Sequence, residues 1–270
     1  MKGTDLGGAR VLITGAGSGI GRLMALEAAR RGAAIAVWDR DAAGADETVR
    51  LIAEAGGSAS ATVIDITDRA AVAAAAEREG VVDVVINNAG VVTGATLLEA
   101  SDEAIERTFQ VNTLALFWVT RAFLPGMMER NRGTVVTIAS AAGLLGVARQ
   151  TDYAASKAAA IGFTESLRAE LRGARSRVRT LIFMPYYIDT GMFEGVRSRF
   201  PLLLPILDAQ KAARRVIRGV ERGTQQIMTP PMVRTVPVLR ALPVRAFDGM
   251  ADFFGINHGM DHFVGRGPSR

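Results

Sequence analysis

The sequence predicts a doubly wound α/β fold, in which one parallel sheet of about seven strands carries helices on both faces. Short apolar runs rich in Val and Ile alternate with longer amphipathic stretches from residue 11 to about residue 184. Each run has the length and composition of a strand buried on both faces. The stretches between the runs are long enough to cross over between parallel strands. We therefore expect a single α/β domain.

Each expected strand is followed by an expected helix. The strands are predicted at residues 11–14, 35–39, 61–64, 84–87, 134–138 and 178–184, with a seventh at 225–228. The helices are predicted near residues 20–31, 42–55, 69–79, 102–128, 153–171 and 208–222. No internal repeat and no linker interrupts this order, so all 270 residues are assigned to one domain.

Composition excludes several classes of protein. With 49% apolar and 22% charged residues, the chain is too apolar and too well mixed to be disordered. It has no cysteine, which excludes a disulfide scaffold, a thiolate metal site and a cysteine nucleophile. With only His258 and His262 present, we expect no metal site. The first ten residues contain no apolar signal region, and no uncharged apolar run is long enough to span a bilayer. We predict a cytoplasmic protein.

The charge is uneven along the chain. Residues 1–195 carry 20 basic and 22 acidic side chains, whereas residues 196–270 carry 12 basic and 5 acidic ones. A basic tail is typical of proteins that meet nucleic acid or an anionic membrane. The last third therefore calls for an explanation separate from that of the near-neutral remainder.

A glycine-rich turn joins the first strand to the first helix. The segment reads Thr-Gly-Ala-Gly-Ser-Gly-Ile-Gly over residues 14–21. Glycines at such a turn let backbone amides approach a diphosphate, which the positive end of the helix also stabilises. The strand–turn–helix context is the one that this motif requires. A Rossmann-type dinucleotide site is predicted, with contacts from Gly15, Gly17, Ser18, Gly19, Ile20 and Gly21.

An acidic residue follows at the end of the second strand. Asp39 lies 18 positions after Gly21 and can accept hydrogen bonds from the adenosine ribose hydroxyls, while its charge repels a 2′-phosphate. No basic residue lies within the glycine loop, although Arg40 follows Asp39 directly and offsets part of its charge. We predict NAD as the cofactor, with NADP as the alternative. Capping of the helix at 42–55 is the competing role for Asp39, but Asp41 is better placed for it.

Three further motifs indicate an enzyme. Asn-Asn-Ala-Gly at residues 87–90 ends the fourth strand, Ser140 follows the fifth, and Tyr-Ala-Ala-Ser-Lys at 153–157 opens a helix. Together with the glycine loop, these motifs resemble the short-chain dehydrogenase/reductase family over about residues 11–192. One departure is that Pro185 is followed by Tyr186, where the family usually has Pro-Gly. We expect this change to alter the wall of the nicotinamide pocket and to leave binding intact.

The chemistry of Tyr153 and Lys157 follows from their spacing. Four residues apart, they share one face of a helix. An ammonium close to a phenol favours phenolate and is expected to lower a pKa that starts near ~10. Tyr153 can then exchange a proton with an alcohol or carbonyl oxygen, and Ser140 can hold and polarise that oxygen. The alternative is an ordinary exposed pair of residues on a helix.

The resemblance implies roles for other residues. Lys157 would also bind the nicotinamide ribose, and Asn112 would link it through water to bulk solvent. Asp65 would meet the adenine amino group, unless it only caps the next helix. Asn88 and Gly90 would lie beside the adenosine ribose, with Asn87 stabilising the sheet, and Thr190 would contact the carboxamide. The remaining expected cofactor contacts are Ile66, Ala89, Pro185 and Ile188.

The last third resembles the branch that contains retinol dehydrogenases and 17β-hydroxysteroid dehydrogenases, especially epidermal retinal-dehydrogenase-like members. The resemblance is carried by the segments at residues 185–196, 199–207, 228–231 and 242–247. It implies a hydrophobic alcohol or carbonyl substrate. We expect residues 193–230 to form an apolar lid and the last strand, because an apolar lid excludes water and selects nonpolar ligands. The expected substrate contacts are Leu144, Tyr186, Phe193 and Phe200.

Beyond Pro231, apolar residues are interleaved with Arg234, Arg240 and Arg245. This extension, 231–270, suits peripheral contact with an anionic membrane as well as it suits packing against a second subunit of a homo-oligomer. Pro237 and Pro243 argue against a long surface helix. No aromatic-basic platform appears in this tail, so we expect no nucleic-acid partner.

These observations predict an NAD-dependent oxidoreductase that interconverts a hydrophobic alcohol, such as a retinoid, steroid or long-chain lipid, and its carbonyl. Two alternatives stay open. One is a soluble NADPH-dependent reductase of 3-oxoacyl or xenobiotic carbonyl compounds. The other is a non-catalytic NAD-binding lipid sensor or scaffold.

Overall fold

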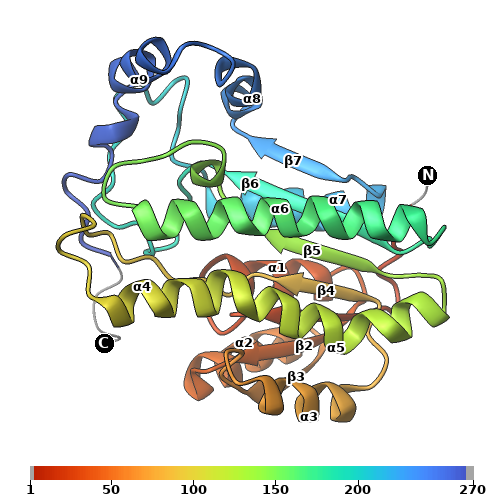
Figure 1. Ribbon diagram of the computed structural model, residues 1–270. Helices are drawn as coiled ribbons and strands as arrows, with labels where there is room; N and C mark the ends of the chain where they lie inside the picture. Colours follow the sequence, from red (N-terminus) through yellow and green to blue (C-terminus); the bar gives the residue numbers. More distant parts are fainter. Residues whose placement is uncertain (1–2, 266–270) are drawn as a thin grey trace.

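The computed structural model describes residues 3–265 and confirms the predicted doubly wound sheet (Figure 1). Seven parallel strands lie in the order β3-β2-β1-β4-β5-β6-β7. Their bounds are β1 Arg10–Thr14, β2 Ala34–Asp39, β3 Ser58–Val63, β4 Val84–Asn87, β5 Thr134–Ile138, β6 Arg179–Pro185 and β7 Gln226–Thr229. The order reverses between β1 and β4, so a crevice opens there at the carboxyl ends of the strands, where ligands of such sheets bind.

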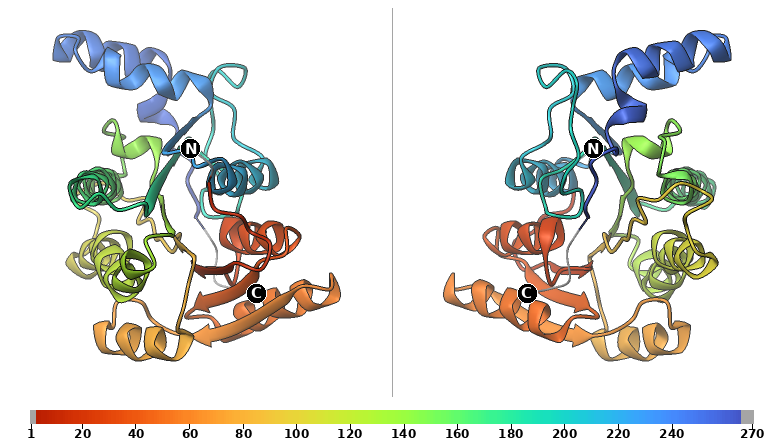
Figure 2. Two further views of the ribbon diagram at one scale, coloured as in Figure 1. Left: turned by 90° about the vertical axis from the view of Figure 1, so that its right-hand side faces the viewer. Right: turned by 90° about the vertical axis from the view of Figure 1, so that its left-hand side faces the viewer.

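Helices form a layer on each face of the sheet (Figure 2). The long helices are α1 Gly19–Ala29, α2 Ala42–Glu54, α3 Arg69–Glu79, α4 Asp102–Phe109, α5 Ala115–Glu129, α6 Thr151–Gly173 and α7 Ala209–Arg222. Helices α7, α1 and α2 cover one face, and α6, α5 and α3 cover the other. Short 3₁₀ turns lie at Ala141–Gly143, Pro231–Thr235 and Ile256–His258.

The core consists of two main clusters, one on each side of the sheet. Successive side chains of a strand point to opposite faces. In β1, Val11 and Ile13 pack with Met24 of α1, whereas Leu12 packs with Val119 of α5. All of these side chains are buried, and burying one such apolar side chain stabilises a fold by about 1.5–3 kcal/mol. The Val-rich strands therefore hold both helical layers in place.

Two expected elements differ from those observed. The third strand begins at Ser58, three residues before its predicted start. The apolar pattern missed these residues because β3 is an edge strand whose serines are exposed. The single helix expected at residues 102–128 is divided by a π-helical turn at Gln110–Leu114. Such turns insert a residue into a helix and are frequent at functional sites.

The chain continues beyond β7 into α8, Val236–Leu239, and α9, Val244–Phe253, which stand above the β7 edge in Figure 1. Pro237 lies in the first turn of α8, and Pro243 precedes α9, positions at which a missing backbone N–H costs nothing. No helix within residues 3–265 is long and apolar enough to cross a bilayer. The last five residues of the 231–270 extension lie outside the described residues.

Candidate active site

A cavity of about 980 Å³ lies at the carboxyl ends of the strands. It runs from the glycine loop and the ends of β2 and β4, past Ser140 and Tyr153, to the inner faces of α8 and α9. The cavity thus joins a polar end, formed by the sheet, to an apolar end, formed by the last third of the chain. No cluster of His, Asp or Glu suited to a metal ion occurs in the part of the chain that the structure describes.

The glycine loop forms a cradle that only small residues permit. Gly15 and Gly19 adopt positive φ angles of 67° and 55°, which favour glycine. A Cβ atom on Gly15 would lie 2.8 Å from the Cα of Ala89, and one on Gly17 would lie 2.8 Å from a carboxylate oxygen of Asp39. Helix α1 begins at Gly19, so its amino-terminal N–H groups face the cavity. This cradle fits the diphosphate of a dinucleotide.

Arg22 fastens the back of the loop. Its guanidinium donates to the carbonyl of Gly17, to Thr48 Oγ1 at 3.0 Å and to the Gly44 carbonyl at 3.2 Å. Thr48 donates in turn to the Ala16 carbonyl at 2.9 Å. These contacts tie the loop to α2, and no sequence motif pointed to them.

Asp39 ends β2 beside the loop and lines the cavity. Its Oδ2 accepts the N–H of Gly17 at 2.7 Å, and its Oδ1 accepts the N–H of Asp41 at 3.0 Å. Asp41, not Asp39, occupies the N-cap position of α2. Arg40 is exposed and also lines the cavity. A carboxylate is therefore fixed beside the cradle with a cation next to it.

Asp65 lines the cavity two residues after β3. It accepts hydrogen bonds from Thr67 N and Thr67 Oγ1, at 3.0 and 2.7 Å, and pairs with Arg107 at 3.1 Å. Partial burial acts to raise the pKa of Asp65, but the Thr67 hydrogen bonds and the Arg107 charge together lower it. The next helix is capped by Asp68, whose carboxylate accepts the N–H groups of Ala70 and Ala71. Asp65 is therefore not the cap of that helix.

The Asn-Asn-Ala-Gly segment holds β4 against the glycine loop. The Asn88 amide donates to the carbonyls of Thr14 and Gly15 at 2.9 and 3.1 Å. Asn87, the last residue of β4, is instead buried and donates to Thr120 Oγ1 at 3.1 Å. Asn88, Ala89 and Gly90 all line the cavity, whereas Asn87 does not line it within the described residues.

Ser140, Tyr153 and Lys157 meet at the middle of the cavity. Ser140 begins the 3₁₀ turn after β5, and its hydroxyl accepts the N–H of Ala142 at 3.1 Å. Lys157 Nζ lies 5.6 Å from the centroid of the Tyr153 ring and donates to the Ile138 carbonyl at 3.0 Å. Both Tyr153 and Lys157 are buried on the inner face of α6, as their spacing predicts.

Burial dominates the titration of this pair. It raises the pKa of the Tyr153 phenol to about 12, while contact with the Ser140 hydroxyl acts in the opposite direction. Burial also lowers the pKa of Lys157 to about 8. The expected lowering of the phenol pKa is therefore not found in the protein alone. The physical reason is that desolvation disfavours both charged forms.

Asn112 lies within the π-helical turn and does not line the cavity among the described residues. Its Oδ1 accepts the Val91 N–H at 2.8 Å, and its Nδ2 donates to the Val91 carbonyl at 2.9 Å and to Ser156 Oγ at 3.0 Å. A Cβ on Gly90 would lie 3.3 Å from Asn112 Oδ1 and 3.5 Å from Lys157 Nζ. Asn112 and Lys157 thus both lie close to Gly90.

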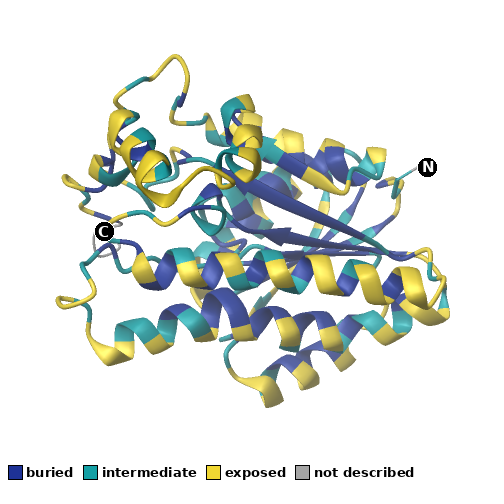
Figure 3. Ribbon diagram, turned by 45° about the horizontal axis from the view of Figure 1, so that its top comes forward, coloured by how far each residue is buried: buried dark blue, intermediate teal, exposed yellow. Residues whose placement is uncertain are grey.

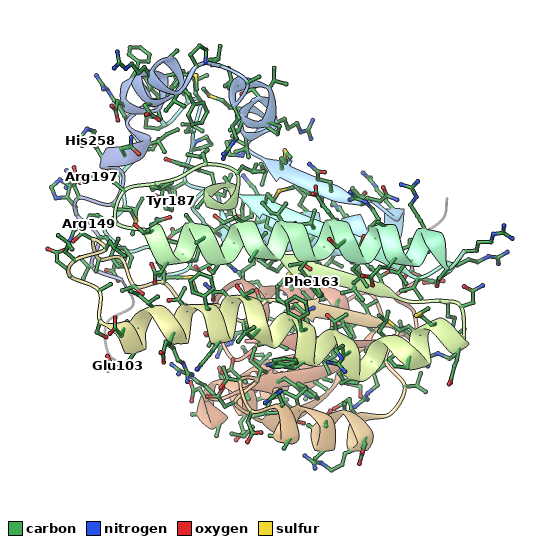
Figure 4. The ribbon with its side chains drawn as sticks, in the orientation of Figure 1. Glu103, Arg149, Phe163, Tyr187, Arg197 and His258 are labelled. Carbon is green, nitrogen blue, oxygen red and sulfur yellow. The ribbon has the colours of Figure 1, made fainter. Side chains whose placement is uncertain are left out.

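Aromatic side chains form the wall opposite the glycine loop. The Tyr153 ring meets Phe193 edge-on at 5.7 Å, and Phe193 meets Tyr187 at 5.1 Å. Figure 4 labels Tyr187 near the amino-terminal end of α6. Tyr187 accepts a hydrogen bond from Gln150 Nε2 at 3.1 Å. The Tyr186 that replaces the usual glycine also lines the cavity, as do Ile66, Pro185, Ile188 and Thr190.

Most of the apolar end of the cavity is formed by residues beyond Pro231, which sequence reasoning did not assign to the site, while Leu204 comes from the predicted lid. Helices α8 and α9 turn Val236, Leu239, Phe247, Met250 and Phe254 inward, and Leu204 and Met232 complete this wall. The signal was present in α9, where Phe247, Met250 and Phe254 recur at helical spacing. The extension expected to meet a membrane or a subunit therefore also lines the cavity.

Two residues expected at the substrate lie outside the cavity lining in the described part of the chain. Leu144 packs against the Leu116 and Ile182 cluster, and its carbonyl accepts a hydrogen bond from Arg240 at 2.6 Å. Phe200 stacks on Phe253 and Phe254, with ring centroids 5.5 and 5.8 Å away. Phe200 therefore packs against the carboxyl-terminal end of α9 and not into the cavity.

The sheet order, the glycine cradle and the Ser140–Tyr153–Lys157 group define a nucleotide-dependent oxidoreductase. A family model described as short chain dehydrogenase matches residues 9–200, and the chain belongs to the short-chain dehydrogenase/reductase family, whose members use NAD or NADP. A solved relative from Burkholderia phymatum in complex with NAD has 28% identity and a TM-score of 0.80, over 88% of this chain and 95% of that one. A metagenomic short-chain oxidoreductase in complex with NADP has 28% identity and a TM-score of 0.71, over 84% and 99%.

Similarity to retinol dehydrogenases covers almost the whole chain. Epidermal retinol dehydrogenase 2 of Mus musculus is 40% identical over 97% of this chain and 87% of its own length. Retinol dehydrogenase 10 of Xenopus tropicalis is 38% identical over the same shares. The protein therefore belongs to the retinol dehydrogenase branch of the family.

Proposed function

We propose that this protein is an NAD-dependent dehydrogenase that interconverts a hydrophobic alcohol, such as a retinoid, steroid or long-chain lipid, and its carbonyl. The observation that carries the proposal is one continuous cavity, polar where the glycine loop lines it and apolar where α8 and α9 line it. Ser140, Tyr153 and Lys157 lie between the two ends. The names of the relatives support an alcohol of the retinol type.

The chain's own residues suffice for binding and proton transfer. The cradle at Gly15–Gly21 holds the diphosphate, Asp39 the adenosine ribose, and Asp65 the adenine amino group. When bound, the nicotinamide supplies the hydride acceptor or donor. Ser140 orients the substrate oxygen, and Tyr153 takes its proton during oxidation or returns it during reduction. Lys157 holds the nicotinamide ribose and, when charged, favours the phenolate.

Asp39 supports the preference for NAD. Its carboxylate is fixed by two backbone N–H groups beside the cavity, where it would repel a 2′-phosphate. Asp39→Asn keeps one oxygen acceptor and removes the charge, and the exposed Arg40 stays in place. We expect the ratio of kcat/KM with NADP to kcat/KM with NAD to rise at least tenfold. Asp46→Asn, an exposed site on the same helix–strand unit, is the matched control. A wild-type enzyme faster with NADP would contradict the assignment and favour the NADPH-dependent carbonyl reductase.

The apolar end of the cavity predicts selection by chain length. We expect kcat/KM to rise along a series of linear alcohols, because each buried methylene contributes about 0.8 kcal/mol, or roughly fourfold. Phe247→Ala shortens the apolar wall and should flatten the rise, whereas Phe253→Ala, on the outer face of α9, should leave it unchanged. The dependence of kcat/KM on chain length is measured from initial rates of NADH formation, with retinol and steroid alcohols tested in parallel. Equal rates for short and long alcohols would contradict the substrate class.

The protein's surroundings are proposed from the same features. Exposed Leu114 and Phe117 on the α5 side offer an apolar face for a homo-oligomer. We place the protein in the cytoplasm, with peripheral contact to membranes through its C-terminal part. A chain that binds NAD and turns over none of these alcohols would instead be a lipid sensor.

A further inference from the structure

A second hollow, outside the active site, is lined mainly by basic side chains. It is a groove of about 550 Å³ between α7 and the unpaired edge of β7. Six basic side chains line it, and no acidic one does among the described residues: Lys211, Arg214, Arg215, Arg218, Arg222 and Arg234. We call it the basic groove.

Few of these charges are neutralised within the chain. Arg214 lies 3.7 Å from Glu27, and Arg215 donates to Thr229 Oγ1 at 2.6 Å. Lys211, Arg218, Arg222 and Arg234 form no ion pair with any residue between 3 and 265. The acidic residues of the same region are engaged elsewhere, since Glu221 pairs with Arg31 and Asp208 caps α7. Uncompensated like charges in a concave surface raise the local concentration of anions.

An apolar surface begins where the basic groove ends. Arg234 connects the two, because it lines the groove and its 3₁₀ turn leads directly into α8. The outer faces of α8 and α9 expose Val238, Val244 and Phe253 by 75%, 74% and 59%, and Leu202 in the neighbouring loop is 99% exposed. These helices stand on the β7 side of the molecule, and Figure 3 shows their outer surface almost wholly exposed. A patch of this kind marks an interaction site.

Helices α8 and α9 carry apolar side chains on both sides, and α9 also exposes Arg245, Asp248 and Asp252 to solvent. Their inner side chains line the active-site cavity, and their outer side chains face solvent.

We propose that the basic groove binds the phosphate groups of anionic lipids and seats the apolar outer face of α8 and α9 on a membrane. The chemistry is a row of phosphates next to a hydrocarbon layer, which matches cations beside exposed aliphatic side chains. A second copy of the chain fits poorly, because a twofold contact would oppose two sets of six cations. Lipid alcohols would then enter the cavity from the membrane, and this part of the proposal rests on the proposed function.

Binding to vesicles tests the groove directly. The full chain is mixed with sedimentable vesicles, made of phosphatidylcholine alone or with about 30 mol% phosphatidylserine as the probe. Each basic residue close to an anionic surface adds about 1 kcal/mol to the free energy of binding, or about fivefold in the partition coefficient. We expect binding to require phosphatidylserine and to weaken with salt. Arg218→Glu with Arg222→Glu should reduce the partition coefficient at least ~25-fold. Arg78→Glu with Arg121→Glu, exposed on α3 and α5, is the control of equal charge and should change it much less.

Further measurements distinguish anionic lipid from other ligands of the groove, and the groove proposal from the proposed function. Val238→Asp should weaken binding without altering its dependence on phosphatidylserine, and turnover of a short water-soluble alcohol should be normal in every variant, which shows that each one folds. Equal loss in the groove and control variants would overturn the proposal. So would tighter binding to an RNA or DNA fragment, displacement from vesicles by millimolar inorganic phosphate, or a change of oligomeric state in place of a change in partition. Vesicle binding without turnover of any alcohol would reject the proposed function and leave the groove intact.

Discussion

Tyr153→Phe should reduce kcat for alcohol oxidation and carbonyl reduction by about 10³-fold or more. General acid–base transfer contributes roughly 10²–10⁴-fold, and the substitution removes the only atom of this side chain that can exchange a proton. Dinucleotide binding should change less than about threefold, because the cradle lies on β1 and α1. Initial rates and fluorescence titration with NADH measure the two effects separately.

The same residue sets the pH dependence. Because burial raises the pKa of the phenol to about 12 in the protein alone, the phenol is protonated at neutral pH. Oxidation needs the deprotonated form and should accelerate from pH 7 to pH 10, whereas reduction should not. Tyr187→Phe removes a neighbouring buried hydroxyl and should alter kcat less than tenfold. Similar losses in both variants would assign the effect to packing.

Lys157→Met should stabilise the protein without cofactor at neutral pH while reducing turnover at least a hundredfold. Burial lowers the pKa of Lys157 from 10.5 to about 8, so the charged form costs the fold about 3 kcal/mol below pH 8. Methionine fills a similar volume without that cost. It also leaves the Ile138 carbonyl without its hydrogen-bond donor, which destabilises the variant by about 1 kcal/mol. A net gain of about 2 kcal/mol in the free energy of unfolding is expected at pH 7.

The stability gain of Lys157→Met should depend on pH, because it comes from the charge of Lys157. Between pH 8 and pH 10.5 the unfolded wild-type chain binds more protons at Lys157 than the folded chain does, so wild-type stability rises with pH across this window. The Lys157→Met variant lacks that rise, and its advantage should disappear toward pH 10.5. Urea denaturation at several pH values measures it. Lys211→Met, at an exposed lysine of α7, is the control and should show no such window. A variant less stable than wild type at pH 7 would refute the desolvation argument.

The parts of the site that could be predicted are those built from local sequence. Gly15 follows β1 and Asp39 is the last residue of β2, and Tyr153 and Lys157 share a helix face by spacing alone. Parallel strands bring their carboxyl ends to one edge, so motifs on separate strands could be expected to meet there. The pKa direction of Tyr153 could not be predicted in this way. It depends on how completely other elements cover the phenol, because burial is the largest influence on this pKa.

By itself the sequence determined the fold class, the order of the elements and the polar half of the site, because each depends on patterns within a few residues. Only the tertiary structure decided the other half. It placed Phe247 and Met250 of α9 at the cavity, packed Phe200 against the end of that helix, and set Asn112 in a π-helical turn. It also gathered the surplus charge of the last third into one groove along β7. The reason is that these features depend on how segments distant in sequence pack together, and helical periodicity cannot tell a cavity from the core or from an outer face.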